Sequence, residues 1–287
     1  MKANSNSETS RIAEPVADLS ATLPPLRLLT FNIAHGRGLA LYQGFQRKTR
    51  LRKNLDRIAR LLVASGADLV ALQEVDESSY WNRRLHLLEY LQTAADYPSS
   101  AMSVHNRRDG RRPLAYGNGF LTRFPVEHSL THAFGQATMG EKGFQYVETA
   151  TPYGTLPLIN LHLDYRSRKR RIQQVEQLAS FLQQRSERSP EGRNHLFPPI
   201  VCGDFNSSSK PAQDAVAHLF RFLGEHEHYS IWPKAARTFP AHLPSRGLDF
   251  ILLPACFELR MCQVIRSFAS DHLPVLVEFA PAARTQS

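Results

Sequence analysis

Short apolar runs alternate along this chain with segments in which apolar residues recur every three or four positions. The first pattern is typical of buried strands and the second of amphipathic helices. The apolar runs predict strands at residues 26–33, 68–72, 117–123, 144–149, 156–163, 200–203, 248–253 and 273–279. The helical spacing predicts helices at residues 46–65, 83–95, 168–184 and 212–223. The polar, basic segment 100–113 and the segment between residues 223 and 248 are predicted to be loops.

The order of these elements predicts one domain over residues 26–280. No linker divides the chain and no short repeat is visible. One order of elements does occur twice: a strand, a helix and a second strand that leads to an acidic residue, which is Glu74 in the first half and Asp204 in the second. Residues 1–25 are polar and are predicted to be a disordered leader, and residues 281–287 a frayed tail. The leader lacks the apolar core of a signal peptide, so we expect a cytoplasmic location.

Composition narrows the class of protein. With 42% hydrophobic and 21% charged residues in 287, the chain is typical of a globular protein. Its longest apolar runs have the length of strands and are too short to cross a bilayer; we expect a monomer without a transmembrane segment. The net charge of +9 favours a polyanionic partner such as nucleic acid, a phosphorylated substrate or an anionic lipid surface, or simply a basic protein. The three cysteines show no disulfide or zinc-site spacing.

One polar motif follows directly on a predicted strand, at Gly203-Asp204-Phe205-Asn206. Side chains two residues apart on an extended segment point the same way, so Asp204 and Asn206 can enter one cavity while Phe205 turns into the core. A carboxylate beside a carboxamide can hold a metal, a water or a phosphate oxygen. The same four residues also form a good turn.

Other predicted strands carry polar residues at their ends as well. The full set is Asn32, Glu74, His162, Asp204, Asn206, Asp249, Asp271 and His272. Singly, each could be a turn former, a solvated charge or a core histidine. Buried unpaired charges are costly, so as a group they would neutralise one another or bind a cation. Oxygen ligands without a cysteine cluster suit Mg²⁺, Mn²⁺ or Ca²⁺, and imidazoles beside such a cation suit hydrolysis of a phosphate ester.

Together these motifs resemble the endonuclease/exonuclease/phosphatase superfamily, which has the deoxyribonuclease I-like fold. They occur in the family's order, as Thr30-Phe31-Asn32, Gln73-Glu74, Asn160-Leu161-His162, Gly203-Asp204-Phe205-Asn206, Leu248-Asp249-Phe250 and Ser270-Asp271-His272. The resemblance implies an α/β (α+β) four-layer sandwich of two stacked, mostly antiparallel sheets flanked by helices, with the active site at one rim. His162 and Thr238-Phe239-Pro240 are more similar to the sphingomyelinase-like and broad bacterial members than to the apurinic-endonuclease branch.

The resemblance implies a metal site. Asn32 and Glu74 would hold Mg²⁺ or Mn²⁺, as one or two ions, and Asp271 would be a further or water-mediated ligand.

The resemblance also implies catalytic roles. Asp204 and Asn206 would orient the attacking water and a phosphate oxygen, and His162 would contact the phosphate. Asp249 would pair with His272. The general base would be either His272 or Asp204, and we favour the His272–Asp249 pair.

The substrate is less defined than the chemistry. Arg166 and Arg168 begin a basic run that could grip phosphates of the substrate or an anionic surface, or could form a solvated helix face. We expect a Mg²⁺-dependent phosphodiesterase acting on a phospholipid-type or small diester. The alternatives are a DNA or RNA nuclease and a non-catalytic module that binds phosphorylated ligands.

Overall fold

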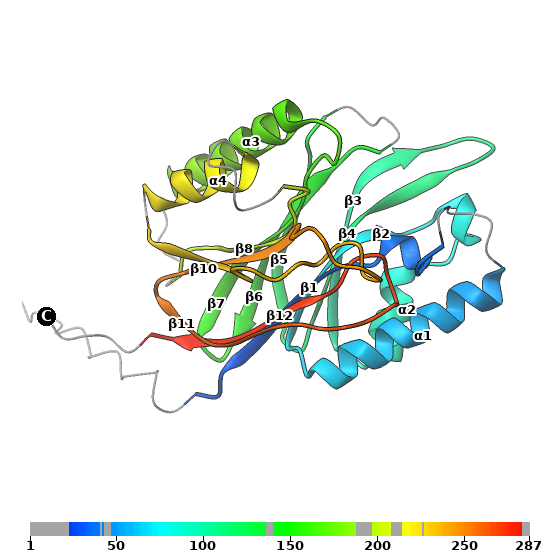
Figure 1. The fold of residues 1–287 in the computed structure, drawn as a ribbon, viewed down its shortest axis with the longest axis horizontal. Coiled ribbons are helices and arrows are strands. Elements are labelled where there is room, and N and C mark those ends of the chain that lie inside the picture. The colour runs from blue at the N-terminus through cyan, green and yellow to red at the C-terminus, as the bar shows by residue number, and fades with distance from the viewer. Residues whose placement is uncertain are drawn as a thin grey trace, which may run out of the picture.

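Two six-stranded β-sheets form the centre of the protein (Figure 1). The computed structural model describes residues 23–40, 42, 47–135, 140–187, 197–207, 214–225 and 227–282. The first sheet has the order β11 (Phe257–Val264), β12 (Val275–Pro281), β1 (Leu26–Asn32), β2 (Leu69–Asp76), β4 (Leu114–Thr122) and β3 (Ser99–Arg108). The second has the order β5 (Val126–Ala133), β6 (Gly143–Thr151), β7 (Gly154–His162), β8 (Ile200–Asp204), β10 (Asp249–Pro254) and β9 (Tyr229–Trp232).

Helices cover the outer face of each sheet, which gives four layers. Helices α1 (Lys48–Ser65) and α2 (Leu87–Ala94) pack on the first sheet, and α3 (Arg168–Glu187) and α4 (Ala215–Gly224) on the second. Successive residues of β1 show the alternation: Leu28 lies in the core between the sheets, whereas Leu29 lies under the helices. Cys202 also lies in the core between the sheets.

Each sheet contains one parallel pair of strands, made by a helical crossover. β1 and β2 are joined by α1, and β7 and β8 by α3, whereas the other strand pairs are antiparallel. The predicted sandwich of mostly antiparallel sheets is therefore confirmed, and the repeated strand–helix–strand order corresponds to the two crossovers.

The prediction of a loop at residues 100–113 was wrong. Residues 99–108 form β3, an edge strand whose polar residues hide the strand pattern. The apolar pattern also did not predict strands β5, β9 and β11. β5 and β9 are the two edges of the second sheet, and β11 is the other edge of the first.

The helix predicted at residues 83–95 is shorter in the structure. A 3₁₀ turn, η2 (Tyr80–Asn82), comes first, and Arg83 and Arg84 then adopt left-handed φ angles of 63° and 58°. These angles are incompatible with a helix, so α2 begins at Leu87, and the side chain of His86 caps its first turn.

The predicted leader and tail lie mostly outside the described residues, which begin at residue 23 and end at residue 282. Pro281, which was predicted to be in the tail, is the last residue of β12. Within the described part of the chain, none of the helices combines the length and apolar character needed to span a membrane.

Candidate active site

The polar strand ends of both sheets meet at one rim of the sandwich. In the first sheet, Asn32 at the end of β1 pairs with Gln73 of the parallel strand β2. In the second sheet, His162 at the end of β7 pairs with Asp204 of the parallel strand β8. Asp204 also pairs with Asp249 at the beginning of the antiparallel strand β10. The two parallel crossovers therefore bring these side chains to the same edge.

A β-bulge sets the direction of Glu74. Gln73 and Val75 pair with consecutive residues of β4, so Glu74 is the extra residue in its strand. Its φ of +56° lies in the left-handed region. A bulge interrupts the strand's alternation and re-aims a side chain, which explains how β2 continues to Asp76 while Glu74 faces the rim.

Lys142 and two imidazoles surround the Glu74 carboxylate. Lys142 Nζ lies 3.3 Å from it, His35 Nε2 3.6 Å and His162 Nε2 3.9 Å. Burial raises the pKa of Glu74, but Lys142 and then His35 outweigh this and hold the pKa well below its usual range. Glu74 is therefore ionised and available to a cation.

A second histidine–aspartate pair lies behind Glu74 and was not predicted from the sequence. His35 Nδ1 lies 2.9 Å from Asp76 Oδ2, and Trp81 Nε1 donates to Asp76 Oδ1 at 2.9 Å. The His35 ring makes edge contacts with Trp81 and Tyr116, with ring centroids 5.2 and 5.1 Å away. Burial lowers the pKa of His35, and Asp76 more than compensates and raises it. The pair fixes the imidazole that contacts Glu74.

Asp204 is the most central carboxylate of the site. Its Oδ2 accepts a hydrogen bond from Asn32 Nδ2 at 3.0 Å and lies 3.5 Å from His162 Nε2 and 3.7 Å from His272 Nε2. Burial, together with the charge of Asp249, raises the pKa of Asp204 to about 6 despite the opposing effect of His272. A carboxyl group with this pKa can hold or release a proton near neutral pH.

The turn after β8 fixes Asp204 and Asn206 relative to each other. The Asn206 N–H donates to Asp204 Oδ1 at 2.9 Å, and the Asn206 side chain donates to the carbonyl of Leu163 at 3.0 Å. Phe205 is fully buried under α3 and α4, as predicted. The motif is thus both a turn and a part of the rim, and the catalytic role of Asn206 stays a prediction.

His272 and Asp249 form a buried pair. His272 Nδ1 lies 3.0 Å from Asp249 Oδ2, which also accepts a hydrogen bond from Thr238 Oγ1. The Phe239 ring lies 4.8 Å from the His272 ring, between centroids. Burial lowers the pKa of His272, but the charges of Asp249 and Asp204 raise it to about 10. The aspartate therefore orients Nε2 toward the centre of the site and keeps the imidazole protonated.

Lys142, which precedes β6, is a cation of the site that the sequence did not indicate. Its Nζ lies 3.3 Å from Glu74 Oε1 and 3.5 Å from His162 Nδ1. Burial and the charge of Lys142 lower the pKa of His162 well below its usual value, so His162 is neutral. A lysine outside any motif gives no signal in one sequence, because lysines are common on protein surfaces.

Asn160 connects the two sheets behind the rim. Its Oδ1 accepts from Gln73 Nε2 at 2.7 Å, and its carbonyl accepts from Asn118 Nδ2 at 2.7 Å. Its own Nδ2 donates to carbonyls of β2 and β4. These hydrogen bonds fix the position of β2, which carries Glu74, relative to β7, which carries His162.

Asp271 was predicted as a metal ligand. Its carboxylate forms an ion pair with Arg37, with Nη2 2.5 Å from Oδ2, and its carbonyl accepts from the Ala241 N–H at 2.7 Å. The negative charge of Asp271 also contributes to the raised pKa of His272. Its role as a ligand stays a prediction.

Arg166 and Arg168 were predicted to bind substrate. Arg166 is exposed, donates from Nε to the Tyr165 hydroxyl at 2.6 Å and lies over that ring at 5.0 Å. Arg168 is the exposed first residue of α3. Arg171, from the same basic run, is buried beside Asp214 and has a structural role. The substrate role of the first two stays a prediction.

The composition of the rim fits a hard divalent cation. Asp204, Asp249 and His272 are buried, and one side-chain oxygen or nitrogen of each lies within 4.8 Å of the others. Glu74 adds an ionised carboxylate on the opposite sheet, where Asn32 Oδ1 accepts from the Ala34 N–H at 2.9 Å. Carboxylate-rich sets with one imidazole and no thiolate suit Mg²⁺ or Mn²⁺.

Two bacterial proteins are among the sequence relatives of this chain. "Uncharacterized protein YbhP" of Escherichia coli (strain K12) is 26% identical over 267 residues, covering 88% of this chain and 95% of that protein. "UPF0294 protein" of Klebsiella pneumoniae (strain 342) is 33% identical over 88 residues, which is 31% of each chain.

Solved structures share the fold at low sequence identity. An endonuclease/exonuclease/phosphatase from Beutenbergia cavernae DSM 12333 aligns with a TM-score of 0.67 at 18% identity, over 91% of this chain and 72% of that one. The mannosyl-6-phosphatase Bt3783 of Bacteroides thetaiotaomicron VPI-5482 gives 0.60 at 16% identity, over 89% and 99%. SmcL gives 0.57 at 15% identity, over 89% and 99%.

The family model provides the assignment. Residues 29–272, which include every polar strand end of the rim, match the model of the Endonuclease/Exonuclease/phosphatase family. The fold and the order of the motifs agree with this match. The chain belongs to the Endonuclease/Exonuclease/phosphatase family.

Proposed function

We propose that this protein is a divalent-metal-dependent phosphoesterase that cleaves a phosphodiester by attack of water. The observation that carries the proposal is the convergence of Glu74, Asp204 and the His272–Asp249 pair, from both sheets, on one rim with His162 and Lys142. Membership of the family supports the reaction class.

The metal would be held by Glu74 and Asp204, with Asn32, Asp249 and Asp271 near them. When bound, a divalent cation would screen the phosphate charge, lower the pKa of an attacking water and offset the carboxylates that keep a proton on His272.

Lys142 and His162 are placed to bind the phosphate. Lys142 has a positive charge at the rim, and its neighbour His162 is neutral and can donate one hydrogen bond. Because both also contact Glu74, a phosphate there would lie beside the metal site. These two residues would stabilise the charge that develops on the phosphoryl oxygens.

His272 and Asp204 are the two groups placed to handle the proton of the attacking water. Asp249 orients His272, whose Nε2 faces Asp204 at 3.7 Å. We assign the base role to the His272–Asp249 pair and the orientation of water to Asp204. His272→Ala and Asp204→Asn test this, because loss of the base would leave a slow rate that rises with external imidazole only in the former variant.

The activity test uses bis-p-nitrophenyl phosphate with Mg²⁺ or Mn²⁺. We expect turnover that EDTA abolishes, and a fall of about a hundredfold or more in Glu74→Gln and in His272→Ala. The matched control is Arg57→Gln, an exposed position on α1, which should keep the wild-type rate. Wild-type turnover in either site variant would contradict the proposal.

The substrate class is tested in parallel. We favour a phospholipid-type or small diester, in line with the similarity to sphingomyelinase-like members, over DNA or RNA. Plasmid DNA, RNA, sphingomyelin and phosphoinositides should be compared with Mg²⁺ under one set of conditions. An inert protein across this panel would instead favour a module that binds phosphorylated ligands.

A further inference from the structure

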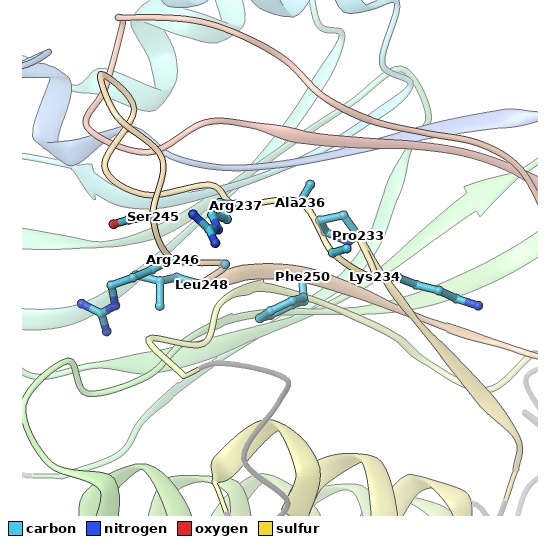
Figure 2. A pocket seen from close by; sticks show the side chains of 10 residues that line it. Pro233, Lys234, Ala236, Arg237, Ser245, Arg246, Leu248 and Phe250 are labelled. Carbon is cyan, nitrogen blue, oxygen red and sulfur yellow. The ribbon is translucent and has the colours of Figure 1, made fainter.

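Lys142 keeps its ammonium inside the rim, although lysine is a residue type that is usually exposed. Its side chain is 11% exposed, and Nζ lies 3.3 Å from Glu74 Oε1 and 3.5 Å from His162 Nδ1. By contrast, Figure 2 shows Lys234 and Arg246, both exposed, extending in opposite directions from the segment between β9 and β10. Burial of an ammonium is costly unless a partner offsets it, so the contact with Glu74 is what keeps Lys142 in place.

The backbone of Lys142 cannot withdraw this charge from the rim. The Lys142 carbonyl accepts a hydrogen bond from the Phe134 N–H at 3.0 Å. The next residue, Gly143, packs so closely that a Cβ there would lie 2.3 Å from the carbonyl oxygen of His132 and 2.5 Å from His105 Nδ1. Any displacement of the ammonium must therefore come from rotation of the flexible side chain that carries it.

The two imidazoles that also face the carboxylates of the rim are fixed, unlike Lys142. His35 Nδ1 lies 2.9 Å from Asp76, and His272 Nδ1 lies 3.0 Å from Asp249. A carboxylate bonded to Nδ1 holds its imidazole in one orientation. Lys142 has no such partner of its own: within the described residues, the single carboxylate that its ammonium contacts is the one expected to bind the metal.

A metal and Lys142 would compete for Glu74. A divalent ion bound to Glu74 would share this carboxylate with an ammonium that lies 3.3 Å from Oε1. Two cations on one carboxylate repel each other, and the repulsion is stronger in a buried site than in water. The ammonium of Lys142 can relieve it by rotating away, whereas the fixed imidazoles cannot.

We propose that Lys142 is an internal counter-ion of Glu74 that leaves this carboxylate when a divalent metal binds, so that its ammonium binds the phosphate only in the metal-loaded site. The inference rests on the proposed function and deepens it, because one side chain then couples metal binding to phosphate binding. In the metal-free site the carboxylates repel a phosphate, and Lys142 is engaged with Glu74.

Metal affinity tests the competition without any turnover. Mn²⁺ is titrated calorimetrically into the protein in the absence of substrate. Lys142→Met removes the charge but keeps a long side chain, so it should bind Mn²⁺ about tenfold more tightly than wild type, and Lys142→Gln should do the same. The control Lys53→Met removes an exposed charge from α1 and should bind as wild type does. Equal or weaker binding in the two Lys142 variants would overturn the inference, because loss of a lysine that merely holds Glu74 in place would weaken metal binding.

A second test follows the displaced ammonium in the wild-type protein. Lysine labelled with carbon-13 at Cε gives an NMR signal for each lysine, and the signal of Lys142 is the one that is absent from Lys142→Met or Lys142→Arg. Inorganic phosphate should shift this signal in Mg²⁺ and leave it unchanged in EDTA, and it should not move the signal of Lys53 in either. A shift of the same size in EDTA would overturn the coupling.

Failure of the proposed function and failure of this inference give different results. If neither wild type nor the variants bind Mn²⁺, the proposed metal dependence fails, and the role of Lys142 fails with it. If all of them bind Mn²⁺ with equal affinity, the proposed function stands and only the role of Lys142 is overturned.

Discussion

Gly203 allows two strands to approach each other directly before the central carboxylate. Its φ is +140°, and a Cβ placed there would lie 1.9 Å from the carbonyl oxygen of Leu161 in β7. That oxygen is backbone and cannot move aside without displacing β7, which ends at His162. The absence of a side chain at position 203 thus allows the short distance between Asp204 and His162. Both the packing of the two strands and the turn after β8 require a glycine here.

Replacing Gly203 by alanine tests this close approach. We expect Gly203→Ala to destabilise the fold by about 3 kcal/mol or more, because a buried strand must shift and the new residue is held at an unfavourable φ. Urea unfolding followed by circular dichroism measures the change. Gly224→Ala is the control, since no atom lies within 4 Å of its Cβ, and it should stay within about 1 kcal/mol of wild type. Similar stability of the two variants would show that the strands do not constrain Gly203.

Strands of the sheet interior were predictable, and strands at the edges were not. The predicted strands correspond to β1, β2, β4, β6, β7, β8, β10 and β12, which are covered on both faces and therefore read as apolar runs. The four strands without a prediction, β3, β5, β9 and β11, are the four sheet edges. An edge strand is partly exposed and carries polar residues, so its sequence resembles that of a loop.

In the candidate site, too, the features that follow from a regular strand pattern were predictable, and those that depend on strand register or tertiary structure were not. Asn32, His162 and Asp204 end regular interior strands, so the sequence pattern identified them as polar strand ends. Glu74 was identified as a strand-end acid, but the bulge that aims it was not, since a bulge depends on the register with β4. Lys142 reaches the rim from the beginning of β6, through a fold that local periodicity does not encode.

At the scale of the whole molecule, each sheet contains one crossover unit that contributes residues to the rim. β1–α1–β2 carries Asn32 and Glu74, and β7–α3–β8 carries His162 and Asp204. Neither unit contains a complete donor set. The distance between the two units is therefore set by the packing between the sheets, and a change at that interface would alter the site without touching any rim residue.

The buried imidazole of His105, which lies between the two sheets, should make the stability of the protein depend on pH. The residue is on β3 of the first sheet, and its ring packs against Gly143 of the second, where a Cβ would lie 2.5 Å from Nδ1. Burial, with a smaller effect of the Lys142 charge, lowers the pKa of His105 to about 3. Because the unfolded chain binds a proton near pH 6.5 and the folded chain does not, this residue's contribution to stability is complete above pH 6.5 and is lost as the pH falls toward 3.

Wild type should accordingly lose about 2 kcal/mol more stability than His105→Leu between pH 7 and pH 5. The apolar side chain has no proton to gain, so the difference between the two proteins isolates this imidazole from the other buried histidines. Urea midpoints at the two pH values measure it, and His242→Leu, at an exposed position, should keep the wild-type loss. Parallel curves for wild type and His105→Leu would mean that the imidazole is protonated in the folded protein, which would require water or a shifted Lys142 between the two sheets.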